Sequence, residues 1–562
     1  MPRFPTSMML ILILANTAAG AIFVDDEGLG DFLKIQEAIN ASEPGGLIII
    51  RNGTYDENLV VDKPVVLKGE DNPLVKGSDL SDPFITVTSD NVTLEDLTFS
   101  GCKNDSFNAG TVLILADGCK LLNCTISSSS CHGLCLRDSK DHLISGNLIC
   151  DNRYGGICLH DVSSSQMTEN QVFGNGKWGI TLDGCLNNDL TANEVRENGE
   201  VGVHVISSIG NEITANEISS NSEDGVHILN SKSNVVIVNE IHDNNLNGVN
   251  LESSSSNFVI DNSIIGSGED GVIVVGPGSE NIISKNVVSD SGIDGIGMYK
   301  SDFSTISDNE IFQNRYNGIA LRDGTSRIIV SDNDVYGNVR YGFDLQDSNS
   351  NFIQKNDVYE NLNGIIMSRC DDNNLVSNDI HHNRYGLSLE FVNTVMISEN
   401  GIHNNTDDGI QLKSCIGSGI YNNEIYSNGK DGVHVLSSEH TTITQNDISN
   451  NSGYGVQVLD QSAQMLIMYN TLRRNGGGGI YIYEGEANLV TGNTIAENQN
   501  FDARDNGGNK WLGNFYGDYS GEDLNGDEVG DEPYVIQGNR GVTSIDTRPF
   551  MAMEWLDMRG PT

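Results

Sequence analysis

An asparagine that returns at nearly constant spacing constrains the fold of this chain more than any other feature. It stands in units such as Asn147-Leu148-Ile149 and Asn170-Gln171-Val172, which begin 23 residues apart. The unit continues, with small variations, at Asn193, Asn216, Asn239, Asn262, Asn286, Asn309, Asn333, Asn356, Asn378, Asn400, Asn423, Asn446, Asn470 and Asn493. A fixed period of this length is typical of a solenoid, in which each repeat packs only against its neighbours.

Each period contains three short apolar segments separated by Ser, Asn and Gly. In one repeat these are Gly248-Val249-Asn250-Leu251, Phe258-Val259-Ile260, and Ile264 with its neighbours. Such segments are typical of strands and leave no room for a helix, so we predict an all-β parallel β-helix with three short strands per coil. The asparagines are expected to stack as ladders, because their amides can bond from coil to coil and because Asn tolerates the left-handed backbone of a tight corner.

The N-terminus has the pattern of an export signal. Arg3 precedes the apolar run Met8–Ala15, and the small residues Ala18–Ala21 follow it. This pattern predicts a signal peptide over residues 1–21, and no later run approaches the roughly 20 apolar residues of a membrane span. An uncleaved anchor is the alternative.

The mature chain divides into three predicted segments. Residues 22–100 form an N-terminal cap with the first irregular coils, residues 101–505 form the repeats, and residues 506–562 form an aromatic-rich C-terminal cap. In the first segment, Phe32, Ile35 and Ile39 fall on one helical face after a possible Asp31 N-cap. A short amphipathic helix there would cover the open end of the solenoid.

The tail carries the most specific resemblance. Trp511-Leu512-Gly513-Asn514-Phe515-Tyr516-Gly517-Asp518-Tyr519, followed by Asp523-Leu524-Asn525-Gly526-Asp527 and Gly530-Asp531-Glu532-Pro533-Tyr534, resembles the end of NosD-like proteins. The opening Ile39…Gly45…Gly53-Thr54-Tyr55-Asp56-Glu57 is similar to the first coil of archaeal surface-layer-associated members. The repeats resemble the carbohydrate-binding and sugar-hydrolase (CASH) class of right-handed parallel β-helices. The resemblance implies a fold but not one activity, because the class includes copper-site assembly factors, polysaccharide lyases and epimerases, and surface proteins.

The net charge of the chain limits the kinds of partner that it can bind. The net charge is −46, with 78 acidic against 32 basic residues. Such a chain repels phosphate backbones, so no nucleic-acid binding is expected. With the export signal, the charge predicts a secreted or cell-surface protein, periplasmic if the source is bacterial.

Cysteines concentrate in the first coils. Eight of the ten lie between Cys102 and Cys185. In an exported chain this density predicts disulfides, and Cys135 and Cys158 occupy the same outward position of adjacent coils, about 4.8 Å apart. Reduced thiols in a thin core are the alternative.

Two sets of residues are candidate metal ligands. His204 and His227 continue the outward column of Cys135 and could bind copper or zinc, the NosD resemblance favouring copper. An ordinary exposed strand face is the alternative. Asp523, Asn525, Asp527 and Asp531 resemble the front of a calcium loop, although Tyr534 stands where a closing Glu is needed; an acidic turn is the alternative.

One strand of each repeat has the pattern Gly-Ile/Val-x-Leu/Val, as in Gly318-Ile319-Ala320-Leu321. Candidate catalytic residues lie on or just after these strands in the later coils. Asp344 and Glu390 are two coils apart, and Arg322 and Lys413 would hold an acidic sugar. A solvated strand face is the alternative.

One corner repeats an Arg-Tyr pair suited to stacking on sugar rings. The candidate carbohydrate-binding residues are Arg315, Tyr316, Arg340, Tyr341, Arg384 and Tyr385. Covering the apolar corner of the core is the alternative role.

The sequence favours an exported β-helix protein at the cell surface with a structural or carbohydrate-binding role, whose partner is a polysaccharide or surface glycan. A polysaccharide-active enzyme (lyase, hydrolase or epimerase) is the second reading. A NosD-like copper-site maturation factor is the third, and copper is expected only in that case. Calcium is the other cofactor considered.

Overall fold

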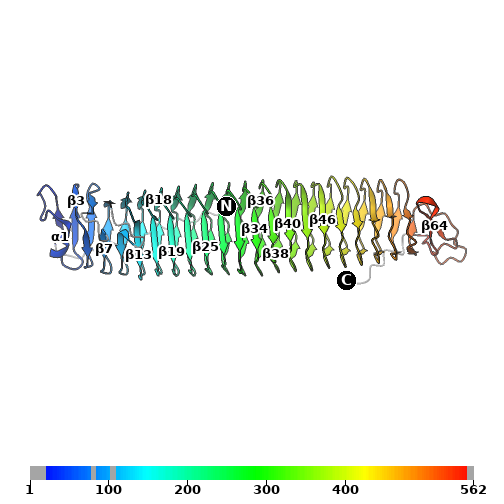
Figure 1. Ribbon diagram of the computed structural model, residues 1–562, viewed down its shortest axis with the longest axis horizontal. Helices are drawn as coiled ribbons and strands as arrows, with labels where there is room; N and C mark the ends of the chain where they lie inside the picture. Colours follow the sequence, from blue (N-terminus) through cyan, green and yellow to red (C-terminus); the bar gives the residue numbers. More distant parts are fainter. Residues whose placement is uncertain (1–19, 78–83, 102–108, 553–562) are drawn as a thin grey trace.

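The computed structural model describes residues 20–77, 84–101 and 109–552. The chain forms a straight rod of about 21 right-handed turns with about 23 residues per turn (Figure 1). The predicted parallel β-helix is confirmed. All but the end of the predicted signal peptide falls outside the described residues, as does Cys102. Within the described ranges, no helix has the length and apolar character needed to cross a membrane.

Three parallel sheets run along the rod, and one coil contributes a strand to each. In the coil of Asn262, sheet C receives β28 (Val249–Glu252), sheet A receives β29 (Phe258–Ile260) and sheet B receives β30 (Ser263–Ile265). Each strand pairs in parallel with its counterpart one coil later, so that β28 pairs with β31 (Val272–Val275) in unbroken register. The backbone hydrogen bonds between coils therefore run parallel to the rod axis.

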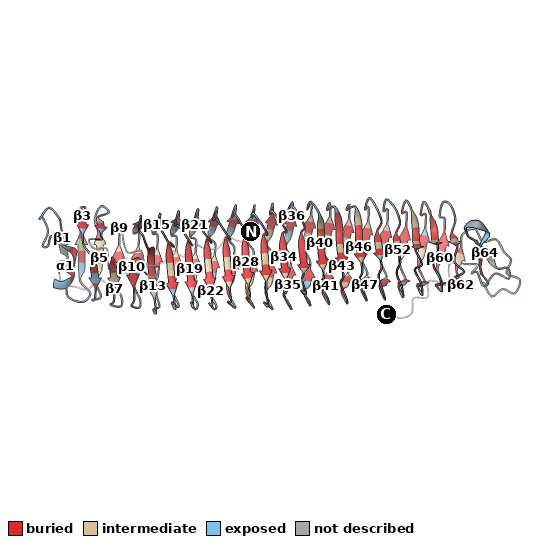
Figure 2. Ribbon diagram, in the orientation of Figure 1, coloured by how far each residue is buried: buried red, intermediate tan, exposed pale blue. Residues whose placement is uncertain are grey.

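The core is a thin stack of aliphatic side chains. Buried residues follow the strands along the length of the rod (Figure 2). Val249, Leu251, Val259 and Ile264 of one coil are all fully buried and lie directly beneath the equivalent residues of the next. Strand residues between them point outward, which gives the alternating burial that the period-two pattern predicts.

Buried asparagines stack as the predicted ladder. The amide nitrogen of Asn286 donates to Oδ1 of Asn309 at 3.0 Å, and that of Asn309 donates to Oδ1 of Asn333 at 2.9 Å. The prediction that these asparagines take the left-handed backbone was wrong. The residue before each one takes it, such as Asp308 with a φ of 57°. The asparagine is needed for its amide, which also donates to a core carbonyl such as that of Ile283.

Two further ladders occupy the other corners. One passes through Asn152 and Asn175, and another through Asn188 and Asn211. In all three ladders the amide nitrogen of one asparagine donates to Oδ1 of its counterpart in the next coil toward the C-terminus.

All three ladders end in a buried carboxylate. The last amides, those of Asn498, Asn509 and Asn514, donate to Asp502, Asp505 and Asp546 at 3.0, 2.8 and 3.0 Å. A carboxylate suits this position because it accepts hydrogen bonds without offering a donor of its own.

A short helix covers the N-terminal end, as predicted. Helix α1 (Ile35–Ala41) buries Ile35, Ala38 and Ile39 against the first coils. The predicted Asp31 cap was wrong, because the N-cap position is Lys34 and lacks a side-chain bond. The carboxylate of Glu57, from the next part of the chain, accepts the first two helical N–H groups at 2.7 and 3.1 Å.

The C-terminal segment leaves the repeat. Strands β64 (Tyr534–Gln537) and β65 (Thr543–Asp546) form an antiparallel pair, and β65 adds to β62 (Lys510–Leu512) at the end of sheet A. The Trp511 and Tyr516 side chains are buried at this end. The segment closes the end of the rod beyond the last coils (Figure 1).

Replacing Asn309 by Leu should destabilise its coil by roughly 1–3 kcal/mol, because the N–H donors and acceptors that meet this amide would lose their partners inside the rod. Hydrogen exchange around β35 (Thr305–Ser307) and β36 (Glu310–Phe312) should rise. Gln171→Leu, at an exposed strand position, is the control. Equal exchange in the two variants would contradict a structural role for the ladder.

Candidate functional site

Polar and charged side chains gather in two columns on the outer face of sheet C. The rim column is the residue directly before the strand-opening glycine, and the central column lies three residues later. Rim positions include Asp224, Asn247, Asp270, Asp294, Asn317, Tyr341, Asn363, Tyr385, Asp408, Asp431 and Tyr454. Central positions include Cys135, Cys158, Thr181, His204, His227, Asn250, Asp344, Gln411, His434 and Gln457.

A groove of about 430 Å³ opens on this face beside β49 (Ile410–Lys413) and β52 (Val433–Leu436). It is lined by Tyr385, Asp408, Gln411, Gly429, Lys430, Asp431, His434, Ser452, Gly453 and Gln457. The groove therefore combines an aromatic ring, two amides, two carboxylates, an ammonium group and an imidazole.

Asp408, Asp431 and His434 converge at the centre of the groove. Nδ1 of His434 lies 3.2 Å from Oδ2 of Asp408 and 3.6 Å from Oδ2 of Asp431. The other carboxylate oxygens are held by the backbone. Oδ1 of Asp408 accepts the Asp431 N–H at 3.0 Å, and Oδ1 of Asp431 accepts the Tyr454 N–H at 2.6 Å.

Burial and mutual charge set the protonation of this group. Burial raises the pKa of the Asp431 carboxyl to about 6, although the Tyr454 N–H that it accepts acts in the opposite direction. Burial lowers the pKa of His434, but its hydrogen bond to Asp408 and the two carboxylate charges outweigh this and raise the pKa above its usual value. The groove thus holds a carboxyl and an imidazole whose pKa values are both raised by their surroundings.

A second buried charge cluster lies farther toward the N-terminus on the same face. The guanidinium of Arg322 is 2.5 Å from Asp344 Oδ2 and 3.6 Å from Asp294 Oδ2, and it donates to the Tyr299 hydroxyl at 3.3 Å. Arg322 therefore supplies the positive charge that its two nearly inaccessible carboxylates require.

The four predicted catalytic residues pair with one another. Besides the Arg322–Asp344 pair, Lys413 Nζ lies 2.6 Å from Glu390 Oε1 on the exposed surface. The register places Glu390 two coils after Asp344 and two residues farther along the strand, as expected. The structure does not bring the two carboxylates to one point, and catalysis by this set stays a prediction.

The predicted Arg-Tyr residues lie at the sheet C corners. The Arg340 guanidinium stacks over the Tyr316 ring at 4.4 Å, and that of Arg384 lies over Tyr385 at 5.2 Å. Arg315 is exposed, and Tyr341 is half-buried at the start of its strand. Among the six, Tyr385 lines the groove.

His204 and His227 stack with ring centroids 5.0 Å apart and planes 15° apart. Both ring nitrogens of His204 are buried and accept or donate no hydrogen bond, and burial lowers the pKa of His204 to about 4. Parallel stacked rings direct their lone pairs side by side, so a shared metal would require the rings to turn. Copper binding here stays a prediction.

Cys135 and Cys158 lie opposite each other on adjacent strands, both as free thiols. Their pairing in a disulfide stays a prediction. Three other cysteines, Cys119, Cys124 and Cys185, are buried and donate to backbone carbonyls, which accounts for them without a bridge.

The tail loop uses its oxygens locally. Asp523 accepts the Gly526 and Glu528 N–H groups at 2.7 and 2.9 Å, and Asp531 accepts the Leu524 N–H at 2.6 Å. Asn525 and Asp527 each accept a backbone N–H as well. Calcium binding by this loop stays a prediction.

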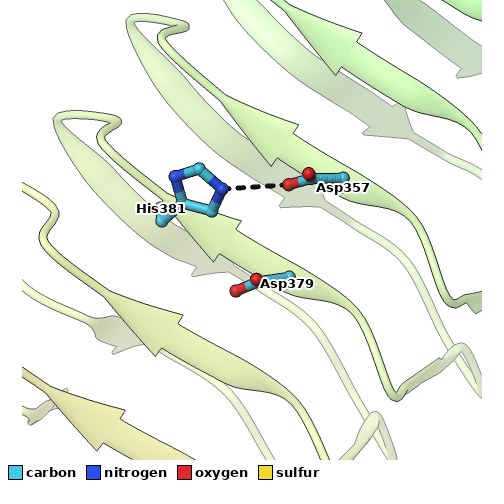
Figure 3. Close-up of side chains that lie close together, drawn as sticks. All are labelled: Asp357, Asp379 and His381. Atoms are coloured by element: carbon cyan, nitrogen blue, oxygen red, sulfur yellow. Dashed lines mark hydrogen bonds and ion pairs between the residues drawn. The ribbon is translucent and has the colours of Figure 1, made fainter.

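Sequence reasoning missed two convergent groups. Among the described residues, two sets of three His, Cys, Asp or Glu side chains bring ligand atoms within 4.8 Å of one another. One is Asp408, Asp431 and His434. The other is an exposed set on sheet B, Asp357, Asp379 and His381 (Figure 3). The available signal was the 23-residue register, because it brings residues of adjacent coils together.

Comparison with known families identifies the fold class. The model of the right-handed beta helix region matches residues 187–335, 323–467 and 407–515, which together span more than half of the chain. The chain therefore belongs to this family. The model of the periplasmic copper-binding protein NosD matches residues 40–224. The predicted NosD-like β-helix relationship is confirmed.

Individual relatives are more distant. A cell surface glycoprotein of Methanothermus fervidus is 30% identical over 137 residues, which are 24% of this chain and 22% of that protein's length. The match thus spans less than a quarter of that relative.

Solved structures with weak likeness include two alginate-modifying enzymes and an adhesin. The periplasmic alginate epimerase AlgG has a TM-score of 0.36 and 15% identity, covering 51% of this chain and 84% of its own. The A-module of Azotobacter vinelandii mannuronan C-5 epimerase AlgE4 has a TM-score of 0.36 and 17% identity, and the match covers 59% of this chain and 92% of the module. The Streptococcus pneumoniae surface protein and adhesin PfbA has a TM-score of 0.36 and 14% identity, and the match covers 53% of this chain and 92% of that structure. Likenesses of this strength carry no conclusion on activity.

Asp270→Asn should stabilise the protein at pH 8. Burial, reinforced by the Asp294 charge, raises the pKa of Asp270 from 3.8 to about 7. The folded protein therefore binds more protons than the unfolded chain between these values, and its stability falls as pH rises through them. Asn would stay neutral and keep the oxygen that accepts the Asp294 N–H.

The expected gain is on the order of 1–4 kcal/mol above pH 7, and it should shrink as the pH falls toward 4. Thermal unfolding measured from pH 5 to 8 tests this. Asp294→Asn is the control and should destabilise, because it removes a charge that faces Arg322. A stability difference between Asp270→Asn and wild type that does not change with pH would contradict the assignment.

Proposed function

We propose that this protein is an exported β-helix protein of the cell surface that binds an extended glycan along the outer face of sheet C. The observation that carries the proposal is the groove around Tyr385, Asp431 and His434. An aromatic ring beside a few convergent polar groups is the composition of many ligand sites. The Gln411 and Gln457 amides add neutral donors and acceptors suited to sugar hydroxyls.

The shape of the rod favours a linear polymer. Outward positions of sheet C repeat at about 4.8 Å along a straight axis, so successive units of an extended chain would meet equivalent columns. Side chains at the rim support this use. Arg384 and Lys430 both bind Asp407 at 3.0 Å and lie over the Tyr385 ring at 5.2 and 6.0 Å. They hold the ring at the edge of the groove and place positive charge beside it.

Several observations support a location outside the cytoplasm. The matched relative is named a cell surface glycoprotein, and the matched family model describes a periplasmic protein. The predicted signal peptide and the net charge of −46 agree with this location.

Tyr385→Ala should weaken glycan binding about 3- to 10-fold, the loss expected for one aromatic contact. A glycan array followed by titration calorimetry on the best ligand measures it. Tyr469→Ala is the control, since Tyr469 is exposed on a different corner and does not line the groove. Equal loss in both variants, or no array ligand for the wild type, would refute binding in the groove.

A polysaccharide-active enzyme is the second candidate, because the groove brings a carboxyl whose pKa is raised to about 6 within reach of an imidazole. If the protein cleaves or epimerises a polysaccharide, Asp431→Asn should reduce the rate by about 10²–10⁴-fold. Reducing-sugar, unsaturated-product and proton-exchange assays measure this. Glu424→Gln is the control, because Glu424 is an exposed carboxylate on sheet B that does not line the groove. Undiminished turnover in Asp431→Asn would exclude catalysis by the groove.

A further inference from the structure

We infer that Asp408, Asp431 and His434 form a binding site for a divalent transition-metal ion. Their ligand atoms, two carboxylate oxygens and the imidazole Nδ1, all lie within 4.8 Å of one another. The separations of 3.2 and 3.6 Å from Nδ1 to the oxygens are those of neighbouring donors around one small ion. The inference rests on the proposed function only for what the ion would contact in the groove.

The carboxylates are oriented before any ion arrives. Each gives one oxygen to a backbone N–H of the following coil, Asp408 to Asp431 and Asp431 to Tyr454. Each therefore turns its other oxygen toward the imidazole. Hydrogen bonds of this kind, made by the ligand atoms' neighbours, commonly fix the geometry of metal ligands.

The charge of the cluster calls for a cation. The side chains of Asp408 and Asp431 are only 3% and 9% exposed. At the comparable Asp294, the chain supplies Arg322. No arginine is among the described residues that line the groove, and Lys430 directs its ammonium group to Asp407 at 3.0 Å. Two buried carboxylates thus face one imidazole, whose Nε2 is buried without a hydrogen-bond partner.

The donor set indicates the kind of ion. Calcium and magnesium prefer oxygen ligands alone, whereas imidazole together with carboxylate suits manganese, iron, cobalt or zinc in the divalent state. Three protein ligands leave coordination positions open toward the groove. Hydroxyl or carboxylate oxygens of a bound glycan would occupy those positions.

The exposed set on sheet B is the natural comparison. His381 Nε2 lies 3.0 Å from Asp357 Oδ1, and Asp379 lies beside them (Figure 3). Asp357 and Asp379 are 50% and 54% exposed, so water already solvates their charge. His381 is also stacked between the Tyr359 and His403 rings at 5.1 Å on either side, which explains its position without a metal.

The test uses the full chain, dialysed against a chelator and then titrated with Zn²⁺, Mn²⁺ and Co²⁺ in equilibrium dialysis with elemental analysis. Bound Co²⁺ is also read from its visible absorption bands. His434→Gln and Asp431→Asn should lose one equivalent of metal, bind it at least about 10-fold more weakly, and lose the corresponding bands. Gln is a compatible replacement, because Gln411 and Gln457 occupy the central column in the adjacent coils.

Two matched variants serve as controls. Asp270→Asn removes a buried rim carboxylate that has no central-column histidine beside it, and His381→Gln removes the imidazole of the sheet B set. Both should keep the equivalent that His434→Gln loses. Wild-type stoichiometry in His434→Gln, or loss of the same equivalent in His381→Gln, would overturn the site.

Glycan binding measured in chelator separates the two proposals. Glycan binding by a wild-type protein that takes up no metal would overturn the metal site and leave the proposed function standing. Metal uptake that is lost in His434→Gln, in a protein without any glycan ligand, would support the metal site and refute the proposed function.

Discussion

The amide-to-amide hydrogen bonds of the asparagine ladders all run in one direction, from each coil to the next, and the ends of the rod are built to suit this polarity. The backbone N–H groups of one coil donate in both directions, that of Asp308 to the next coil and that of Glu310 to the preceding one, so the one-way polarity belongs to the side-chain ladders. A polar stack must begin and end somewhere. The carboxylates of Asp502 and Asp505, in the last coil, and of Asp546, in the C-terminal segment, accept the final amides, so the last donors are satisfied at this end of the rod. The segment is thus part of the ladders as well as their cover.

The same regularity decides where function can arise. Inward positions are committed to the aliphatic stack and corner positions to the ladders, which leaves the outward columns free to vary. A residue placed in a column meets its counterparts from both adjacent coils at about 4.8 Å. Sites on this rod are therefore built across coils, as Asp408, Asp431 and His434 show. No single repeat contains them.

The sequence predicted those parts of the molecule that depend on one period. The three strands, the asparagine ladder and the buried face of α1 all follow from local spacing. The residue that caps α1 could not be predicted from local spacing, because Glu57 accepts the Ile35 N–H from 22 residues away in the sequence. The groove was missed because Asp408-Gly409 and Asp431-Gly432 have the form of ordinary turns. His434 lies in the same column as His204, which the sequence indicated as a candidate metal ligand. What distinguishes His434 is its contact with the rim carboxylates, and these come to lie beside it through the strand register.

The structural role of the rim position does not require a carboxylate. Asn247 accepts the Asp270 N–H at 3.1 Å, so an asparagine is sufficient to hold the next coil. An aspartate at the same position adds a second oxygen and a buried charge, and burial of that charge is costly unless something opposes it. At Asp294 the opposing group is Arg322, and at Asp224 the second oxygen accepts the Asn250 amide at 3.0 Å. At Asp408 and Asp431 the opposing group is a single imidazole in an open groove, so a bound cation would oppose the carboxylate charge that remains there.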